Sequence, residues 1–430
     1  MTDLPAAAPS YAGLLRENTD FRRLWLGEVV SYFGDWFKMI ALYAMVQQIS
    51  DSALAVSGVI VGTTLPVFLV IPIAGPLVDR FDRRKVLLAT DLIRASLVVG
   101  LLAAHHLQSL PLLYATLAVM VGCSGVFIPA RTAVIPEITT KAELPVAMAL
   151  SGGTWSVMLA VGAAIGGVVT GFVGIDGALI LDSATFLGSF AILWGLPALR
   201  PSSDHAEGSD PGLRAGLRYL RRRPYLAGVL CHKPAMGLAG ASLAMLPIFG
   251  KSVFTVGGPL YIGLLYSTRG IGSVFGSLGV RRVIGDAERT LAWAIVPAYS
   301  AMAAGLVTVA YSPTFAVAAL GYLLMALGQG TIWVFSGTLA QHASDSAYRG
   351  RAFSLEFGVM TLATSTSSVL GGAAVDAGWT GVRGVVGASA AWLAVPLVVW
   401  TLALPALLRS RTAPAPAAED RDEIPLGPPV

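Results

Sequence analysis

Long apolar runs dominate this sequence. About twelve stretches of roughly 20 or more mostly apolar residues follow one another, and a helix of that length crosses the hydrocarbon core of a bilayer. Only 13% of the 430 residues are charged, 55% are hydrophobic, and the mean hydropathy is +0.71. A soluble protein of this size needs far more charged surface. The sequence therefore predicts an all-α integral membrane protein, with runs near residues 21–49, 54–78, 86–107, 110–130, 144–172, 176–198, 224–249, 257–280, 290–311, 313–340, 352–375 and 383–408.

The positions of Lys and Arg predict the orientation of these helices. Of the 29 such residues, 23 lie in the termini and breaks on one side of the expected bundle, two on the other side and four within runs. Cytoplasmic loops of membrane proteins are enriched in Lys and Arg. We expect a multi-pass protein of the cell (inner or plasma) membrane with both termini in the cytoplasm and an even number of spans. No cleavable signal peptide is expected in residues 1–19.

The longest polar stretch between runs, residues 200–223, divides the chain in the middle. Its first part resembles a linker. Its second part places Leu213, Leu217 and Leu220 at helical spacing with Arg between them, which predicts a helix on the anionic inner leaflet. The expected units are a cytoplasmic segment (1–20), a six-helix half (21–199), this linker (200–223), a second six-helix half (224–408) and a disordered cytoplasmic tail (409–430).

The two sets of six runs share a short motif. Gly75–Leu77 precedes Arg80 at the end of the second run of the first set, and Gly276–Leu278 precedes Arg281 at the equivalent place in the second set. Internal duplication of six spans is the architecture of a secondary transporter with two parallel halves. The sequence thus favours a transporter in which one chain supplies both halves and functions as a monomer.

The break after the second run, "GPLVDRFDRRKV", gathers six charged side chains between Asp79 and Lys85. A positive-inside anchor explains its basic residues but neither Gly75 nor the acidic residues Asp79 and Asp82. Gly75 would let another helix approach closely at the cytoplasmic mouth. Asp79 would then meet the positive end of that helix or an Arg. We expect a latch that holds while the inner side is closed.

With this turn the sequence resembles the major facilitator superfamily over residues 21–408. The signature of that family in this loop has a Gly, an Asp-Arg pair and a basic cluster, here Gly75, Asp79, Arg80, Arg83, Arg84 and Lys85. The segments "SYFGDW", "IPARTAVIPEI", "LDSATF" and "YRGRAF" resemble the branch of enterobactin-type siderophore exporters and macrolide or multidrug efflux proteins. The efflux signature of span five, Gly-Pro followed by Gly-Gly, is "GAAIGG" here, with Ala163 in the proline position.

The resemblance implies alternating access. Two halves rock around a central cavity that opens first to one side of the membrane and then to the other. Export in this branch is usually driven by protons moving inward, as in an antiporter.

Ionisable residues within the runs are the candidate functional groups, because one at mid-bilayer costs roughly 3 kcal/mol. In the first run Glu28 and Asp35 are seven residues apart and share a helix face, and Lys38 lies one turn beyond Asp35. We predict that Asp35 is the proton-titrating carboxylate and Glu28 the second candidate. The alternative is a permanent Asp35–Lys38 ion pair that only stabilises the helix.

Candidates for cargo contact lie in the second half. Lys233 either binds an anionic substrate or pairs with Asp35 across the cavity, and Arg269 needs an acid partner or an anionic cargo. The full set of substrate-cavity candidates is Lys38, His232, Lys233, Arg269, Gln329 and Trp333.

The remaining charged candidates are assigned to the cytoplasmic gate. Asp91 and Arg94, one turn apart next to the charged turn, are expected to support the latch. Arg131, Arg349 and Arg351 are expected to belong to the equivalent gate network. Asp182 is expected to cap or pair structurally, and Glu356 to face the approach at Gly75.

Other classes of site are not expected. Two cysteines form no disulfide framework, no zinc spacing occurs, and no cofactor, metal or nucleic-acid partner is predicted. The five His are scattered, with His105–His106 in an outer loop, which disfavours an integral-membrane enzyme. A GxxxxGK[ST] loop is lacking, which disfavours ATP-driven transport within this chain. The leading prediction is a proton-coupled exporter of small amphipathic drug-, antibiotic- or siderophore-like molecules. The alternatives are a narrow siderophore or lysolipid carrier, a non-transporting scaffold and an integral-membrane enzyme.

Overall fold

A computed structural model describes residues 10–199, 218–254 and 258–412 of the chain. Every regular element in those ranges is a helix, and the ranges contain no strand. Ten helices are long and apolar enough to cross a membrane. The predicted all-α membrane fold is therefore confirmed. The predicted interfacial helix falls largely outside the described residues, because Leu213 and Leu217 are not among them, and so does most of the tail.

The N-terminal half contains spans one to six. Gly174 divides the last helix of this half, α6, into two spans, because its φ of +74° lies in the left-handed region that glycine adopts without steric cost. A 50-residue helix is about 75 Å long, more than twice the hydrocarbon thickness. The helices of the N-terminal half are α1 (Tyr11–Glu17), α2 (Thr19–Ile49), α3 (Ala53–Arg80), α4 (Arg83–His106), α5 (Leu110–Ile138) and α6 (Leu144–Leu193).

The C-terminal half contains spans seven to twelve, several of them built from consecutive short helices. Span seven comprises α8 (Pro224–Leu230), α9 (His232–Leu238) and α10 (Ala241–Val253). Span eight passes from α11 (Pro259–Val274) through the π-helical turn η1 (Phe275–Gly279) into α12 (Val280–Ile284). The others are α13 (Glu288–Ala310), α14 (Phe315–Ala343), α15 (Ser346–Asp376) and the pair α16 (Val382–Trp392) and α17 (Ala394–Thr412).

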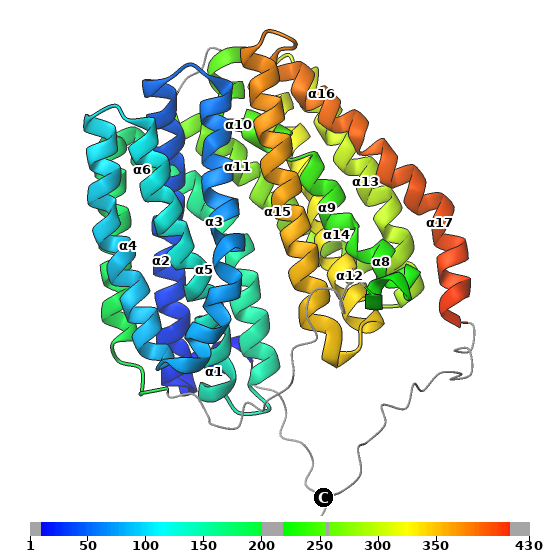
Figure 1. Ribbon diagram of the computed structural model, residues 1–430, viewed down its shortest axis with the longest axis horizontal. Coiled ribbons are helices and arrows are strands. Elements are labelled where there is room, and N and C mark those ends of the chain that lie inside the picture. Colours follow the sequence, from blue (N-terminus) through cyan, green and yellow to red (C-terminus); the bar gives the residue numbers. More distant parts are fainter. Residues whose placement is uncertain (1–9, 200–217, 255–257, 413–430) are drawn as a thin grey trace, which may run out of the picture.

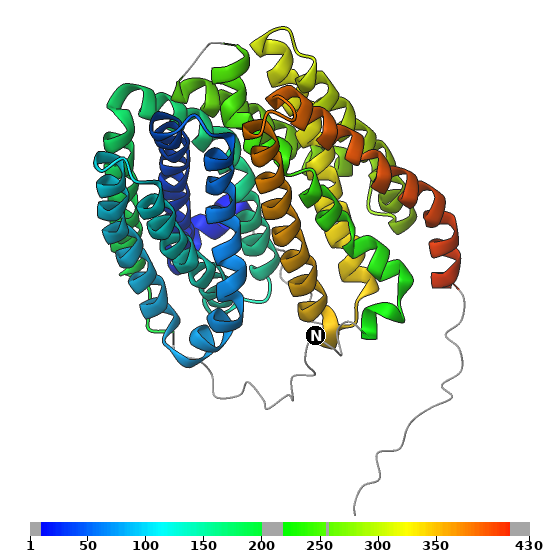
Figure 2. The same ribbon diagram turned by 45° about the horizontal axis from the view of Figure 1, so that its top comes forward.

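These twelve spans form two six-helix halves that stand side by side (Figures 1 and 2). One end of the bundle carries α1, the Asp79–Lys85 turn and the C-terminus of α17, and we call it the basic end. It lies at the bottom of Figure 1. The far end carries the turns at 50–52, 107–109 and 377–381. Large apolar side chains such as Val99 (68% exposed) and Leu402 (75% exposed) cover the outside, as lipid permits.

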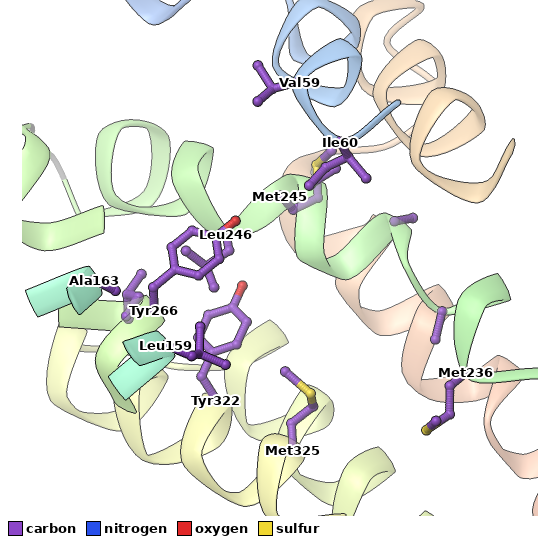
Figure 3. Close-up of a cluster of buried hydrophobic side chains, with 14 of the residues drawn as sticks. Val59, Ile60, Leu159, Ala163, Met236, Met245, Leu246, Tyr266, Tyr322 and Met325 are labelled. Atoms are coloured by element: carbon purple, nitrogen blue, oxygen red, sulfur yellow. The ribbon is translucent and has the colours of Figure 1, made fainter. Parts of the chain in front are cut away.

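The halves share one hydrophobic core near the far end (Figure 3). Side chains of α3 and α6 from the first half pack with side chains of α10, α11 and α14 from the second half. The labelled members are Val59, Ile60, Leu159, Ala163, Met245, Leu246, Tyr266, Tyr322 and Met325, with Met236 of α9 nearby. This shared core holds the far end closed.

Small residues let α6 and α11 pack backbone to backbone across the two halves. A Cβ on Gly270 would lie 2.4 Å from the backbone of Ala160, and one on Gly263 would lie 2.5 Å from the carbonyl oxygen of Ala163. Ser267 also donates a hydrogen bond to the Ala160 carbonyl, at 2.6 Å. Ala160, Ala163 and Gly167 of span five therefore provide a close-packing surface for the opposite half.

A carboxylate joins the halves at the edge of the far end. Asp376, the last residue of α15, accepts hydrogen bonds from the Ser52 hydroxyl (2.5 Å) and from the backbone N–H groups of Ala53 (2.7 Å) and Leu54 (3.1 Å). It caps the N-terminus of α3, where the helix dipole favours a negative charge. We call this contact the Asp376 clamp.

At the basic end, the close helix approach that the sequence predicted at Gly75 is not observed. A Cβ on Gly75 would meet no atom within 4 Å, whereas further along α3 the ring of Phe68 lies 2.5 Å from a Cβ on Gly358 of α15. The predicted approach at Gly75 is therefore absent in this conformation. The reason is that α3 and α15 pack together along their far-end portions.

The close packing at Gly270 predicts that a larger side chain there hinders closure of the far end. In a background without Cys123 and Cys231, Thr64→Cys and Ser365→Cys should crosslink, because the native hydroxyls are 3.0 Å apart across the halves. Gly270→Leu should lower the crosslinking yield several-fold, since its side chain would overlap the Ala160 backbone. Gly171→Leu on α6 is the control, because a Cβ there meets nothing within 4 Å. An unchanged yield in Gly270→Leu would contradict this packing.

The Asp376 clamp predicts that its removal shifts the equilibrium of the far end from closed towards open. Asp376→Ala removes charge-assisted hydrogen bonds worth about 1.5–3 kcal/mol, so opening should become roughly ten- to a hundredfold more frequent. The measurement is the rate at which a membrane-impermeant maleimide labels Ser365→Cys, applied from the far-end side. Asp20→Ala is the control, because Asp20 pairs with Arg23 inside one half. Equal labelling rates in both variants would rule out a clamping role.

Candidate functional site

Three charged side chains meet inside the N-terminal half. Lys38 Nζ lies 2.5 Å from Asp35 Oδ1 on the same helix and 3.7 Å from Asp182 Oδ2 on α6. Lys38 and Asp182 are buried, whereas the Asp35 side chain is 31% exposed. Neither oxygen of Asp182 has a hydrogen-bond partner in the described part of the chain. One cation thus serves two carboxylates, and the group carries one negative charge when both are ionised.

The sequence expectation for this group is met in part. The Asp35–Lys38 ion pair that the spacing predicts is present. Asp182, which the sequence suggested would cap or pair structurally, completes the group and makes it more than a pair. The ring of Phe186 lies 5.1 Å from Lys38 Nζ and separates it from the next charged pair.

Asp91 and Arg94 form that next pair. Arg94 contacts the Asp91 carboxylate, to which Ser189 also donates a hydrogen bond of 2.7 Å. The guanidinium lies between the rings of Phe127 (4.6 Å) and Phe186 (4.4 Å). Both charged residues are buried among α4, α5 and α6. The structure therefore places them in the interior of the half instead of beside the charged turn.

Glu28 is brought together with a predicted gate residue. Arg131 of α5 contacts the Glu28 carboxylate, and Ser151 of α6 donates to it at 2.8 Å. Arg131 also donates to the Tyr32 hydroxyl at 3.0 Å. Glu28 therefore belongs to a separate buried cluster from Asp35, although the two lie on one helix. Arg131 lies in this cluster and not with the residues of the turn.

The charged turn is attached to its own half. Asp82 caps α4 by accepting from the Arg84 backbone N–H at 2.9 Å. Arg83 pairs with Glu137 of α5, and Arg84 donates to the carbonyl of Trp194. By contrast Asp79, Arg80 and Lys85 are exposed, and the Asp79 carboxylate has no partner in the described ranges. The predicted latch is not made in this conformation, and its role stays a prediction.

The other predicted gate residues lie at the start of α15. Arg349 donates to the hydroxyl and carbonyl of Ser344, each at 3.3 Å. Arg351 lies over the ring of Tyr348, which stacks on Tyr219 at 4.4 Å. These contacts lie within the C-terminal half and the end of the linker, and none of them involves Asp79.

Lys233 is paired inside its own half. Its Nζ lies 2.8 Å from Glu356 Oε2 of α15, and the rings of Trp333 and Phe353 lie 5.1 and 5.4 Å away. The alternative in which Lys233 pairs with Asp35 across the halves is therefore wrong for this conformation. Glu356, expected to face Gly75, instead neutralises Lys233. The second oxygen of Glu356 has no described partner.

His232 points away from the N-terminal half. Its Nδ1 lies 3.1 Å from the Tyr299 hydroxyl of α13, and its ring packs edge-on against Trp400 of α17 at 4.4 Å. The side chain is buried. Because the side chain of His232 packs against α13 and α17, the structure does not place it with the other cargo candidates.

Arg269 and Gln329, two of the predicted substrate-cavity candidates, contact each other. Arg269 Nη2 lies 3.2 Å from Gln329 Oε1 of α14. The buried Nε of Arg269 has no hydrogen-bond partner, and no carboxylate pairs with this guanidinium in the described part of the chain. Next to it on α11, Tyr266 donates to the Tyr43 hydroxyl of the first half at 2.9 Å. Arg269 is thus a half-buried cation beside the contact between halves.

Comparison with known proteins agrees with this geometry. The profile of the family described as "Transmembrane secretion effector", of the major facilitator type, matches residues 9–422. The chain is 26% identical to the uncharacterized MFS-type transporter YfiS of Bacillus subtilis, over 86% of this chain and 89% of that protein. It is 25% identical to the putative bacilysin exporter BacE of the same organism, over 83% and 88% of the two chains. It is 24% identical to the enterobactin exporter EntS of Escherichia coli, over 68% and 70%.

Solved structures share the fold. A bacterial homologue of the lysosomal transporter Spinster superimposes with a TM-score of 0.69 at 14% identity, covering 92% of this chain and 99% of that one. The nucleoside transporter NupG gives 0.67 at 12% identity, covering 89% and 98%. The profile match over nearly the whole chain and the transporter relatives exclude the enzyme alternative. The chain belongs to the transmembrane secretion effector family of major facilitator superfamily transporters.

Proposed function

We propose that this transporter exports small amphipathic molecules, drug-, antibiotic- or siderophore-like, in exchange for protons. The Asp35–Lys38–Asp182 group is the observation that carries the coupling, because a lysine shared by two buried or half-buried carboxylates leaves one of them available for a proton. The relatives BacE and EntS, named as exporters of bacilysin and enterobactin, support export as the direction of transport.

The proposed orientation places the basic end in the cytoplasm of a cell that keeps this protein in its inner or plasma membrane. The excess of Lys and Arg at that end supports this orientation. The far end then faces outward, and the Asp376 clamp closes the outer side. The moving units are the six-helix halves, residues 21–199 and 224–408, and a single chain supplies both, so the monomer is the functional unit.

The coupling step follows from the charges of the group. With both carboxylates ionised, the group has a net negative charge, which is costly in a low-dielectric interior. A proton that enters through the half-exposed Asp35 makes the group neutral and reduces the cost of enclosing it. Proton binding therefore favours the conformation in which Asp35 loses its contact with water. Release on the other side restores the charge and reverses the preference.

Neutralising either acid should uncouple transport. In proteoliposomes, Asp35→Asn and Asp182→Asn should lower cargo flux driven by a pH gradient at least tenfold. Exchange of cargo without a gradient should continue, since the amide keeps the shape of the carboxyl group. Bacilysin and enterobactin, named for the relatives, are the first cargoes to test, followed by a dye panel. Asp20→Asn, on the exposed start of α2, is the matched control.

The outcomes separate the parts of the proposal. Gradient-driven flux at the wild-type rate in both variants would exclude this group as the proton site, and Glu28→Gln is then the next variant. Wild-type flux that ignores the pH gradient would exclude proton coupling itself. Absence of any flux in reconstituted wild-type protein would favour the non-transporting scaffold.

A narrower alternative, an anionic siderophore or lysolipid carrier, is favoured by one observation. Lys233 is neutralised by Glu356, whereas Arg269 donates to the neutral Gln329 and has no carboxylate partner in the part of the chain that the structure describes. A half-buried guanidinium without a carboxylate suits an anionic cargo group, which it binds through two parallel hydrogen bonds.

Arg269→Gln should therefore discriminate between cargoes. Transport of an anionic dye should fall about tenfold or more, while transport of a cationic dye of similar size should stay unchanged or rise. Arg282→Gln, at an exposed position of α12, is the control. Equal losses for both dyes would indicate a structural role for Arg269 and would remove the support for an anionic cargo.

A further inference from the structure

Two histidines and one aspartate converge at the far end of the N-terminal half. His105 and His106 lie in the last turn of α4, and Asp176 lies in the second part of α6, after Gly174. His105 Nδ1 is 2.6 Å from Asp176 Oδ1, and His106 Nε2 is 3.2 Å from Asp176 Oδ2. One ligand atom from each residue lies within 4.8 Å of the other two. None of these residues takes part in the charged groups described above.

This spacing matches what a small divalent metal ion requires. Ligand atoms bound to one tetrahedral zinc ion at 2.0–2.2 Å are roughly 3.4 Å from one another. The two His–Asp contacts are 2.6 and 3.2 Å, and all three ligand atoms lie within 4.8 Å of one another, so side-chain rotations would let them surround one ion. Imidazole nitrogen and carboxylate oxygen are donors that zinc and related transition metals accept, and three protein ligands leave a coordination position for water.

We propose that His105, His106 and Asp176 form a binding site for a divalent transition metal ion of the zinc type. The ion would bind Nδ1 of His105, Nε2 of His106 and a carboxylate oxygen of Asp176. In the absence of the ion, the same atoms form the hydrogen-bonded contacts that the structure shows.

A neighbouring glutamine supports this assignment. The Oε1 atom of Gln48, at the end of α2, lies 3.3 Å from Nε2 of His105, the ring nitrogen that faces away from Asp176. Metal-bound histidines usually donate their other N–H to an acceptor, which fixes the tautomer and the ring orientation. Gln48 is placed to accept that hydrogen bond, so Nδ1 of His105 is the nitrogen that would exchange its contact with Asp176 for the ion.

The site is accessible and belongs to one rigid unit. The side chains of His106 and Asp176 are 68% and 38% exposed, so an ion can enter from solution at the far end. His105, at 18%, is the more enclosed ligand. All three ligands and Gln48 belong to the N-terminal half. Metal binding should therefore join α4 to α6 without locking one half against the other, and it should not depend on the Asp376 clamp.

The test is zinc binding by the full chain in detergent, purified without a histidine tag. Isothermal titration should give one Zn²⁺ per chain, and Zn²⁺ should raise the melting temperature because it binds the folded state. His105→Ala, His106→Ala and Asp176→Asn should each weaken binding at least tenfold and abolish the shift. Gln48→Leu should weaken binding about tenfold while keeping the stoichiometry.

Two controls make the result decisive. His342→Ala, at the exposed end of α14, should bind Zn²⁺ like the wild type, and so should Asp376→Ala if the site is independent of the clamp. Absence of saturable binding in wild type, or binding that all three ligand variants retain, would overturn the proposal and leave the cluster as a hydrogen-bonded His–Asp contact. These outcomes do not involve transport, so they are independent of the proposed export function.

Discussion

Charges inside a bilayer must be compensated, and in this chain the buried pairs are made within each half. Lys38 pairs with Asp35 and Asp182, Arg131 with Glu28, and Lys233 with Glu356, each inside its own half. The contact between the halves consists of glycines, apolar side chains, hydroxyl groups of serine, threonine and tyrosine, and the Asp376 clamp at its edge. Among the described residues, separating the halves breaks no buried ion pair, so the proposed rocking would avoid the several kcal/mol that an unpaired buried charge costs.

The two halves differ in the charge that remains after this pairing. In the N-terminal half the Asp35–Lys38–Asp182 group has an acid in excess, and in the C-terminal half Arg269 has no acid partner among the described residues. An excess acid suits a proton, and an excess base suits an anionic part of a cargo. Under the proposed function, the proton would bind in one half and the anionic part of the cargo in the other, on opposite sides of the contact between the halves.

The sequence predicted the features that depend on local spacing. The twelve apolar runs, the division into halves and the Asp35–Lys38 pair follow from helix length and from one turn of a helix. It did not predict which helices face each other. Glu28 and Asp35 share a helix face, but Arg131 approaches the first and Asp182 the second. Lys233 finds Glu356 through the packing of α9 on α15, and His105 meets Asp176 across 71 residues, so no motif spacing records either contact.

Asp376 and Asp79 show how the two ends are related. In this conformation Asp376, at the end of α15 in the C-terminal half, is bound to the N-terminus of α3 in the other half. Asp79, at the end of α3, is exposed and has no partner among the residues that the structure describes. Each residue ends a helix that packs against the other half, Asp376 at the far end of the bundle and Asp79 at the basic end. If Asp79 binds a helix N-terminus when the basic end closes, the hydrogen bonds lost at one end are replaced by similar ones at the other. The two conformations then stay close in free energy, and the binding of a proton or a cargo molecule is enough to decide between them.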